Sequence, residues 1–196
     1  MTKLSRKWIP VFAMVLLTPI AARATTIGAK SLELNGFFSY EHVSATLDRP
    51  APQQDLDLST TIFDLEPGLG YFLNSNWEIL GNLVFKHASQ SGFSVDNFGL
   101  KGSAYYHFNT TGTVIPFAGA GLGVLTNGGD SDTDNSSVIV PEIVVGVRWP
   151  FKNIVSFNFT GGYRHQTNYL GSDTSGDEVF LGAGFSVFLQ GGATAQ

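Results

Sequence analysis

The chain has 196 residues and no cysteine, which excludes a disulfide framework and a thiolate metal site. Charged residues make up only 14% of it, against about a quarter in ordinary soluble domains. Glycine (23 residues) and phenylalanine (16 residues) are abundant. A low charge content without long apolar runs indicates a surface that faces lipid at every second residue.

Residues 1–24 have the pattern of a secretory signal peptide. Lys3, Arg6 and Lys7 form a positively charged start, the apolar segment Trp8–Ile20 follows, and Ala22-Arg23-Ala24 offers a small-x-small cleavage site. A spanning helix is the alternative, but it needs about 20 apolar residues. We therefore expect the exported protein to begin at Thr25.

Cleavage after Ala24 would remove four of the eleven basic residues and no acids. It would leave seven Lys and Arg against sixteen Asp and Glu, a net charge of −9. Such an acidic protein is a poor candidate for binding nucleic acid.

From residue 31 onward, stretches of about ten residues alternate in polarity and are separated by turns or loops. This length is enough to cross a bilayer as a tilted strand. The pattern predicts an all-β fold, an eight-stranded antiparallel up-and-down transmembrane β-barrel over residues 25–190, followed by a short polar tail, 191–196. The predicted strands are 31–46, 60–72, 77–87, 97–108, 114–125, 138–149, 154–166 and 178–189.

The connections alternate in length. Those at 73–76, 109–113 and 150–153 are short, whereas those at 48–58, 88–96, 126–137 and 167–177 are long and polar. In outer-membrane barrels short turns face the periplasm and long loops face outside. We therefore expect the outer membrane of a Gram-negative bacterium. The expected partners are outer-membrane lipid, lipopolysaccharide, the barrel-assembly machinery and an extracellular ligand held by the loops.

Period-two alternation assigns one face of each strand to lipid and the other to the lumen. A soluble barrel would have the opposite sense, but it needs a well-charged outer face, which this chain lacks. The charged side chains expected to form a polar network in the lumen are Glu33, Glu41, Asp64, Glu66, Glu78, Lys86, Lys101, Glu142, Arg148 and Arg164.

Aromatic residues gather beside the short turns, where a girdle at the periplasmic headgroup level is expected. This predicted aromatic girdle comprises Tyr71, Phe72, Trp77, Tyr106, Phe108, Phe117, Trp149 and Phe151.

The segments Pro67–Phe72, Asn74–Glu78, Tyr105–Asn109, Ile115–Gly123 and Gly162–Arg164 resemble the OmpA-like and opacity-type outer-membrane β-barrel domains. The resemblance covers nearly all of the exported chain and implies a fold more than an activity. In this class the chain commonly ends on an aromatic residue, whereas here Phe188 is followed by Leu189 and a tail. We also expect no periplasmic peptidoglycan-binding domain of the kind that full OmpA-type proteins carry.

An eight-stranded barrel is just wide enough for its side chains to fill it. We therefore expect opposite charges to pair and plug the lumen, which favours a structural or surface-interaction role. A narrow porin-like channel is the alternative.

The loop Gly129–Asp134 superficially resembles the start of an EF-hand. The twelfth position from Asp130 is Pro141 rather than Glu, and the central glycine is absent. We therefore expect neither a metal nor any other cofactor.

One segment suggests an enzyme. His165-Gln166-Thr167-Asn168, followed by Glu178, resembles the signature of lipid A deacylases of the PagL type. The resemblance implies His165 as base, Thr167 in place of the nucleophilic Ser, and Glu178 as the carboxylate that orients the base. Glu178 falls on the inward parity and His165 on the outward one, so we expect no enzyme activity.

Overall fold

The computed structural model describes residues 5–6, 29–47, 56–90, 93–128, 137–152, 154–166 and 176–189. The predicted signal peptide and the polar tail lie outside these ranges, apart from Ser5 and Arg6. Among the described residues, no helix is long and apolar enough to cross a membrane.

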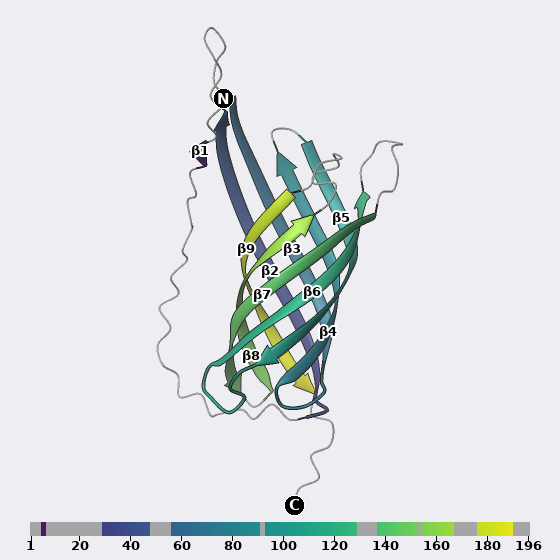
Figure 1. Ribbon diagram of the computed structural model, residues 1–196, viewed down its shortest axis with the longest axis vertical. Coiled ribbons are helices and arrows are strands. Elements are labelled where there is room, and N and C mark those ends of the chain that lie inside the picture. Colours follow the sequence, from purple (N-terminus) through teal and green to yellow (C-terminus); the bar gives the residue numbers. More distant parts are fainter. Residues whose placement is uncertain are drawn as a thin grey trace, which may run out of the picture.

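Nine strands follow one another along the chain (Figure 1). They are β1 (Ser5–Arg6), β2 (Leu32–Leu47), β3 (Leu56–Phe72), β4 (Trp77–Gln90), β5 (Phe93–His107), β6 (Ile115–Gly128), β7 (Ser137–Lys152), β8 (Val155–Gln166) and β9 (Gly176–Leu189).

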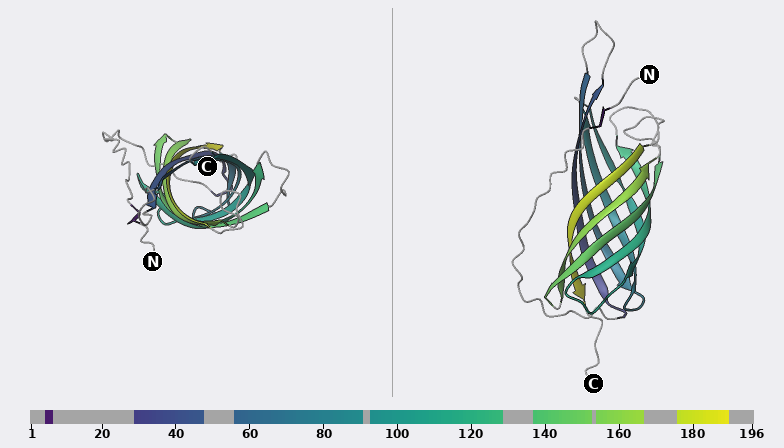
Figure 2. Two further views of the ribbon diagram at one scale, coloured as in Figure 1. Left: turned by 90° about the horizontal axis from the view of Figure 1, so that it is seen from above. Right: turned by 60° about the vertical axis from the view of Figure 1, so that its left-hand side comes forward.

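Strands β2 to β9 form a closed barrel. Each pairs antiparallel with the next, and β9 returns to pair with β2, so that the view from above shows a ring (Figure 2). Closure leaves no free sheet edge along the paired length, which is what a lipid environment demands of backbone polar groups. The two residues of β1 pair only with β2, at Ala45 and Thr46. The predicted eight-stranded antiparallel barrel is therefore confirmed.

The connections 73–76 and 108–114 lie at one end of the barrel, here called the short-turn rim, as does Ile154 just before β8. The start of β2 and the end of β9 meet at the same end, where Leu32 pairs with Leu189. At the first of these turns, the Asn74 side-chain oxygen accepts hydrogen bonds from the backbone N–H of Asn76 (2.8 Å) and Trp77 (2.9 Å). This asparagine turn reverses the chain and starts β4.

One predicted loop is wrong. The segment 88–96 is mostly strand, because β4 runs to Gln90 and β5 starts at Phe93, and these two residues pair. The antiparallel ladder depends on backbone hydrogen bonds, so it continues through the polar residues Ser89 and Ser94 after the apolar alternation has ended. The other long connections are shorter than predicted for the same reason.

The side chains alternate between the outer wall and the lumen, as period two requires. Apolar side chains such as Leu100 (62% exposed) and Ile143 (63% exposed) point outward. Their neighbours Lys101 and Glu142 are buried inside. The outer wall is thus apolar and the charges lie in the lumen. This is the arrangement of a barrel that is embedded in a membrane.

Candidate functional site in the barrel lumen

The lumen contains two groups of charged side chains. The lower cluster, near the short-turn rim, is centred on Arg148, which is 2% exposed. Its guanidinium lies 3.0 Å from Glu33 and 3.3 Å from Glu78. His107 Nε2 lies 2.9 Å from the same Glu78, and the Ser186 hydroxyl donates to Glu33 over 2.5 Å. The strands β2, β4, β5, β7 and β9 are thereby joined across the barrel.

The upper cluster is centred on Arg164 of β8. Its guanidinium lies 2.6 Å from Asp64, 3.1 Å from Glu66, 3.3 Å from Glu142 and 3.4 Å from Glu178. These carboxylates come from three other strands, β3, β7 and β9. One planar cation thus joins four strands, a role that suits the several fixed donors of guanidinium.

Two lysines complete the upper cluster. Lys101 Nζ lies 2.5 Å from Glu66 and 2.9 Å from Glu142. Lys86 pairs with Glu178, which also accepts a hydrogen bond from the Gln166 side chain at 2.6 Å. Three of the four carboxylates around Arg164 therefore have a second cationic partner.

An aromatic layer lies between the two clusters and fills part of the lumen there. Phe117, Val144 and Phe180 form a buried apolar group, against which Phe37 and Tyr105 pack. The rings of Phe37 and Phe180 meet edge to face, and those of Tyr105 and Phe117 are stacked. The predicted plug consisted of polar side chains alone, and this layer was not predicted.

Glycines on the inward face make room for these large groups. A Cβ atom at Gly162 would lie 2.6 Å from the Phe180 ring, which itself lies 3.9 Å from the Arg164 guanidinium carbon. A Cβ atom at Gly121 would lie 2.8 Å from a Glu142 oxygen. Large side chains on one strand therefore occupy the space that an inward-facing glycine leaves on a neighbouring strand.

Little open space remains in the lumen. A cavity of about 40 Å³ lies beside the aromatic layer, lined by charged residues of both clusters, and another of about 20 Å³ lies within the upper cluster. A water molecule needs roughly 10–15 Å³ measured in this way, so the larger cavity has room for about three. These volumes are far below those of an aqueous channel.

The ten side chains predicted to form the polar network all point into the barrel. Nine are buried, and Glu41, near the open end of the lumen, is half-buried. The ion pairs show that these side chains form two separate clusters and not a single network. His107, Glu178 and Gln166 are additional members. The inward parity of His107 was visible in the alternation of the strand 97–108.

The predicted aromatic girdle is wrong at two positions. Phe72 and Phe117 are buried inside the barrel (0% and 4% exposed), because each follows an outward-facing residue and so takes the opposite face. Phe72 packs with Ile115 and Phe188 as an apolar cap at the short-turn rim.

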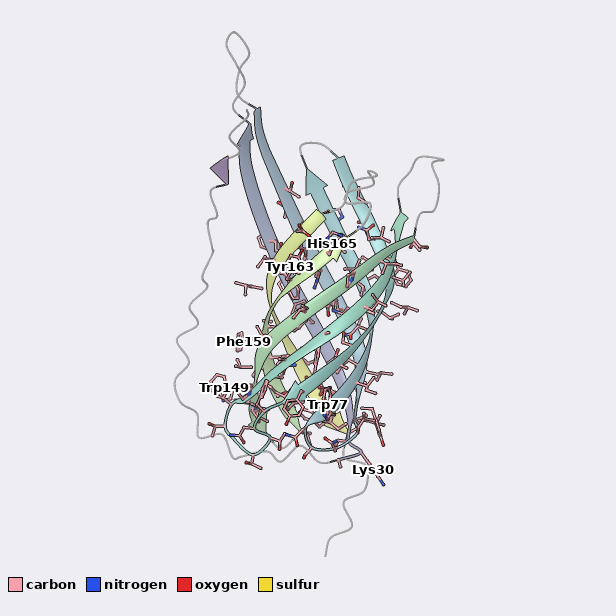
Figure 3. The ribbon with its side chains drawn as sticks, viewed as in Figure 1. Lys30, Trp77, Trp149, Phe159, Tyr163 and His165 are labelled. Carbon is pink, nitrogen blue, oxygen red and sulfur yellow. The ribbon has the colours of Figure 1, made fainter. Side chains whose placement is uncertain are left out.

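The other six members of the predicted girdle are exposed or half-buried on the outside. They are Tyr71, Trp77, Tyr106, Phe108, Trp149 and Phe151. Trp77 and Trp149 lie toward the same end of the barrel as Lys30, whereas Tyr163 and His165 lie toward the opposite end (Figure 3).

Two histidines on the outer wall are paired with aspartates on the neighbouring strand. His87 Nδ1 lies 2.6 Å from Asp96, and His165 Nδ1 lies 2.8 Å from Asp177. Glu178 points into the lumen as its parity predicts and so cannot orient His165. A different carboxylate, that of Asp177, lies beside His165 instead, and it was not predicted. Thr167 lies outside the described residues.

The acidic segment Gly129–Asp134 also lies outside the described residues. Among the residues that are described, no group of three or more His, Asp or Glu side chains is arranged to hold a metal ion.

Comparisons with known proteins agree on the fold. No family model and no curated protein sequence matches the chain. Among solved structures, Neisserial surface protein A matches with a TM-score of 0.51 and 18% identity, over 80% of this chain and 96% of that one. The outer membrane protein OprG from Pseudomonas aeruginosa matches with a TM-score of 0.51 and 12% identity, over 86% and 99%.

The N-terminal β-barrel domain of Pseudomonas aeruginosa OprF is also similar, with a TM-score of 0.48 and 20% identity over 83% of this chain and all of that one. At these identities the likeness concerns the fold alone. It leaves the role of the chain open. The chain has the fold of the small, closed, eight-stranded outer-membrane barrels.

Proposed function

We propose that this protein is a closed outer-membrane barrel with a structural or surface-interaction role. On this proposal its lumen does not conduct ions, and any partner is contacted by the loops opposite the short-turn rim, because loops on a rigid scaffold commonly carry recognition. The observation that carries the proposal is Arg164, which binds carboxylates from three other strands at the middle of the lumen.

Three features support closure. Buried opposite charges attract strongly in a medium of low dielectric, so the ion pairs hold the walls together. The aromatic layer adds a second barrier that contains no charged group. The two internal cavities are small.

A narrow channel is the alternative, and ion conductance in planar bilayers separates the two. The closed barrel should give no steady conductance across a range of voltages and salt concentrations. A reproducible open level in the wild-type protein would reject the plugged state. A porin of known conductance, reconstituted in parallel, establishes that insertion can be detected.

Lipid A deacylation is a second candidate, favoured by the contact between His165 and Asp177. In a hydrolase a carboxylate orients the base, and the base activates a hydroxyl, for which the resemblance implies Thr167. We propose that the chain is not such an enzyme, since a secondary hydroxyl is the more hindered nucleophile. Mass spectrometry of lipid A from a host that lacks its own deacylase tests this. Loss of an acyl chain that is abolished by His165→Ala would establish the activity.

A further inference from the structure

A groove of about 480 Å³ lies on the outer wall of the barrel over β3, β4 and β5. Its lower part is lined by the apolar side chains of Leu65, Phe85 and Phe98, each between 42% and 48% exposed. The rings of Phe85 and Phe98 are in contact, with centroids 5.1 Å apart. The groove is therefore apolar where it faces the hydrocarbon of the membrane.

The strand register arranges the wall around this groove in rows. Leu65 pairs with Phe85, which pairs with Phe98, and these three form the apolar row. The next row away from the short-turn rim is mixed, because His87 pairs there with Phe63 on one side and Asp96 on the other.

The row beyond that consists of hydroxyl residues. Ser89 pairs with Thr61 of β3 and with Ser94 of β5. All three have the outward parity of His87. The wall thus changes from apolar to mixed to hydroxyl-bearing within three successive rows.

The depth of this change matches the edge of the membrane. His87 follows Trp77 by ten residues, which corresponds to about 25 Å along the barrel axis at roughly 3.3 Å per residue and a tilt of about 40°. The apolar band of an outer-membrane barrel is about 25 Å tall. The apolar row therefore lies in the hydrocarbon and the hydroxyl row at the level of the outer headgroups.

The polar end of the groove offers acceptors and hydroxyls. His87 Nδ1 lies 2.6 Å from the Asp96 carboxylate, which leaves the other ring nitrogen, Nε2, to hydrogen-bond a hydroxyl. Asp96 adds a second carboxylate oxygen, and Thr126 also lines the groove. Ser89 and Ser94 bring hydroxyl groups in the row just beyond it. None of the three rows contains Lys or Arg, the residues that bind phosphate. Lys86 also lines the groove, but its side chain is buried inside the barrel, where it pairs with Glu178.

We propose that this groove binds one amphiphile with an acyl chain and a neutral, hydroxyl-rich head group, that is, a glycolipid. The chain occupies the apolar row and the sugar hydroxyls form hydrogen bonds with His87 and Asp96. An anionic phosphate head group is disfavoured, since it would meet the Asp96 carboxylate and no Lys or Arg among the described outward-facing side chains of the groove. The proposal does not depend on whether the lumen conducts.

A matched site on another part of the wall provides a control. His165 also follows the start of its strand by ten residues and also binds an aspartate, Asp177. There, however, the Tyr163 hydroxyl donates to the same carboxylate oxygen at 2.6 Å. At Asp177 two side chains thus share one carboxylate oxygen, and neither His165 nor Asp177 is among the residues that line the groove.

Native mass spectrometry of the full protein tests the proposal. The barrel is released from dodecylphosphocholine micelles to which dodecyl maltoside has been added, and the number of each amphiphile retained per barrel is counted. These probes share one alkyl chain and differ in head group. Wild type should retain one dodecyl maltoside at collision energies that remove every dodecylphosphocholine.

Three variants identify the site. Leu65→Trp fills the apolar row and should abolish retention. Asp96→Ala should lower the preference for the maltoside about tenfold, the cost of one good hydrogen bond to a charged group. His165→Ala should leave both quantities unchanged. Leu65 and Asp96 are exposed on the outer wall, so neither change should prevent folding, which circular dichroism verifies.

Equal retention by wild type and Leu65→Trp would reject the groove as the site. Equal retention of the two probes by wild type would reject the head-group chemistry. A dimer that excludes both probes would assign the groove to a second copy of the chain and overturn the proposal.

Discussion

Removal of the central cation of the upper cluster should destabilise the barrel by an amount that follows from its contacts. In Arg164→Met four carboxylates lose an ion pair. Glu66 and Glu142 keep Lys101, and Glu178 keeps Lys86. These three carboxylates therefore remain compensated.

Asp64 is the exception. Besides Arg164, its hydrogen-bond partner among the described residues is the neutral Ser39 hydroxyl, at 3.1 Å. The variant thus leaves one buried carboxylate without a cation in contact. Breaking a buried pair by removing one partner costs about 3–5 kcal/mol. We expect a loss of that size in the free energy of unfolding, rather than four times as much.

Urea unfolding of the barrel in lipid vesicles, followed by tryptophan fluorescence, measures this loss. A second substitution tests its cause. Asp64→Asn in the Arg164→Met background should recover about half of the lost stability, because it removes the uncompensated charge. Glu178→Gln in the same background should recover none, since Glu178 still has Lys86. A loss below about 1 kcal/mol, or equal recovery by the two second substitutions, would refute the reasoning.

Other predictions concern the faces of the wall and its topology. Leu100→Arg places a charge on the lipid face and should cost about 2–4 kcal/mol in the same unfolding assay; stability equal to wild type would invert the face assignment. Gly121→Val should cost about 1–3 kcal/mol by crowding the lumen, whereas Ala120→Val on the outer face should be nearly neutral. With no native cysteine, Cys at Ser131 should react with an impermeant thiol reagent on intact cells and Cys at Ser75 should not; the reverse pattern would invert the topology.

The strands could be predicted from the sequence because period two is a local property. A residue such as Leu100 needs only its neighbours in the chain to show that it faces lipid. The same periodicity places Phe72 inside the barrel, because Tyr71 before it faces outward. Its position beside a short turn wrongly suggested the girdle. The extension of β4 and β5 could not be predicted in this way, because beyond the membrane the ladder is held by backbone hydrogen bonds that do not depend on the side chain.

The division of the lumen into two clusters depends on non-local information. Arg164 and Asp64 are 100 residues apart, and they meet because the strand register and the barrel stagger bring them to one level. Inward glycines were the available signal. The alternation of polarity is weak in β6 because its inward positions include Gly119, Gly121 and Gly123. Tyr105 and Glu142 of the neighbouring strands fill the space beside Gly119 and Gly121.

The two clusters should close the lumen independently, because an aromatic layer lies between them. Arg164→Met leaves Arg148 paired with Glu33 and Glu78, so this variant should remain closed in planar bilayers although it is less stable. Replacing both arginines by Ala removes the central cation of each cluster, and brief openings are then expected. Phe117→Ala, which thins the aromatic layer, should make those openings longer. Steady conductance from Arg164→Met alone would mean that the upper cluster is the sole barrier, and that the lower cluster and the aromatic layer serve stability only.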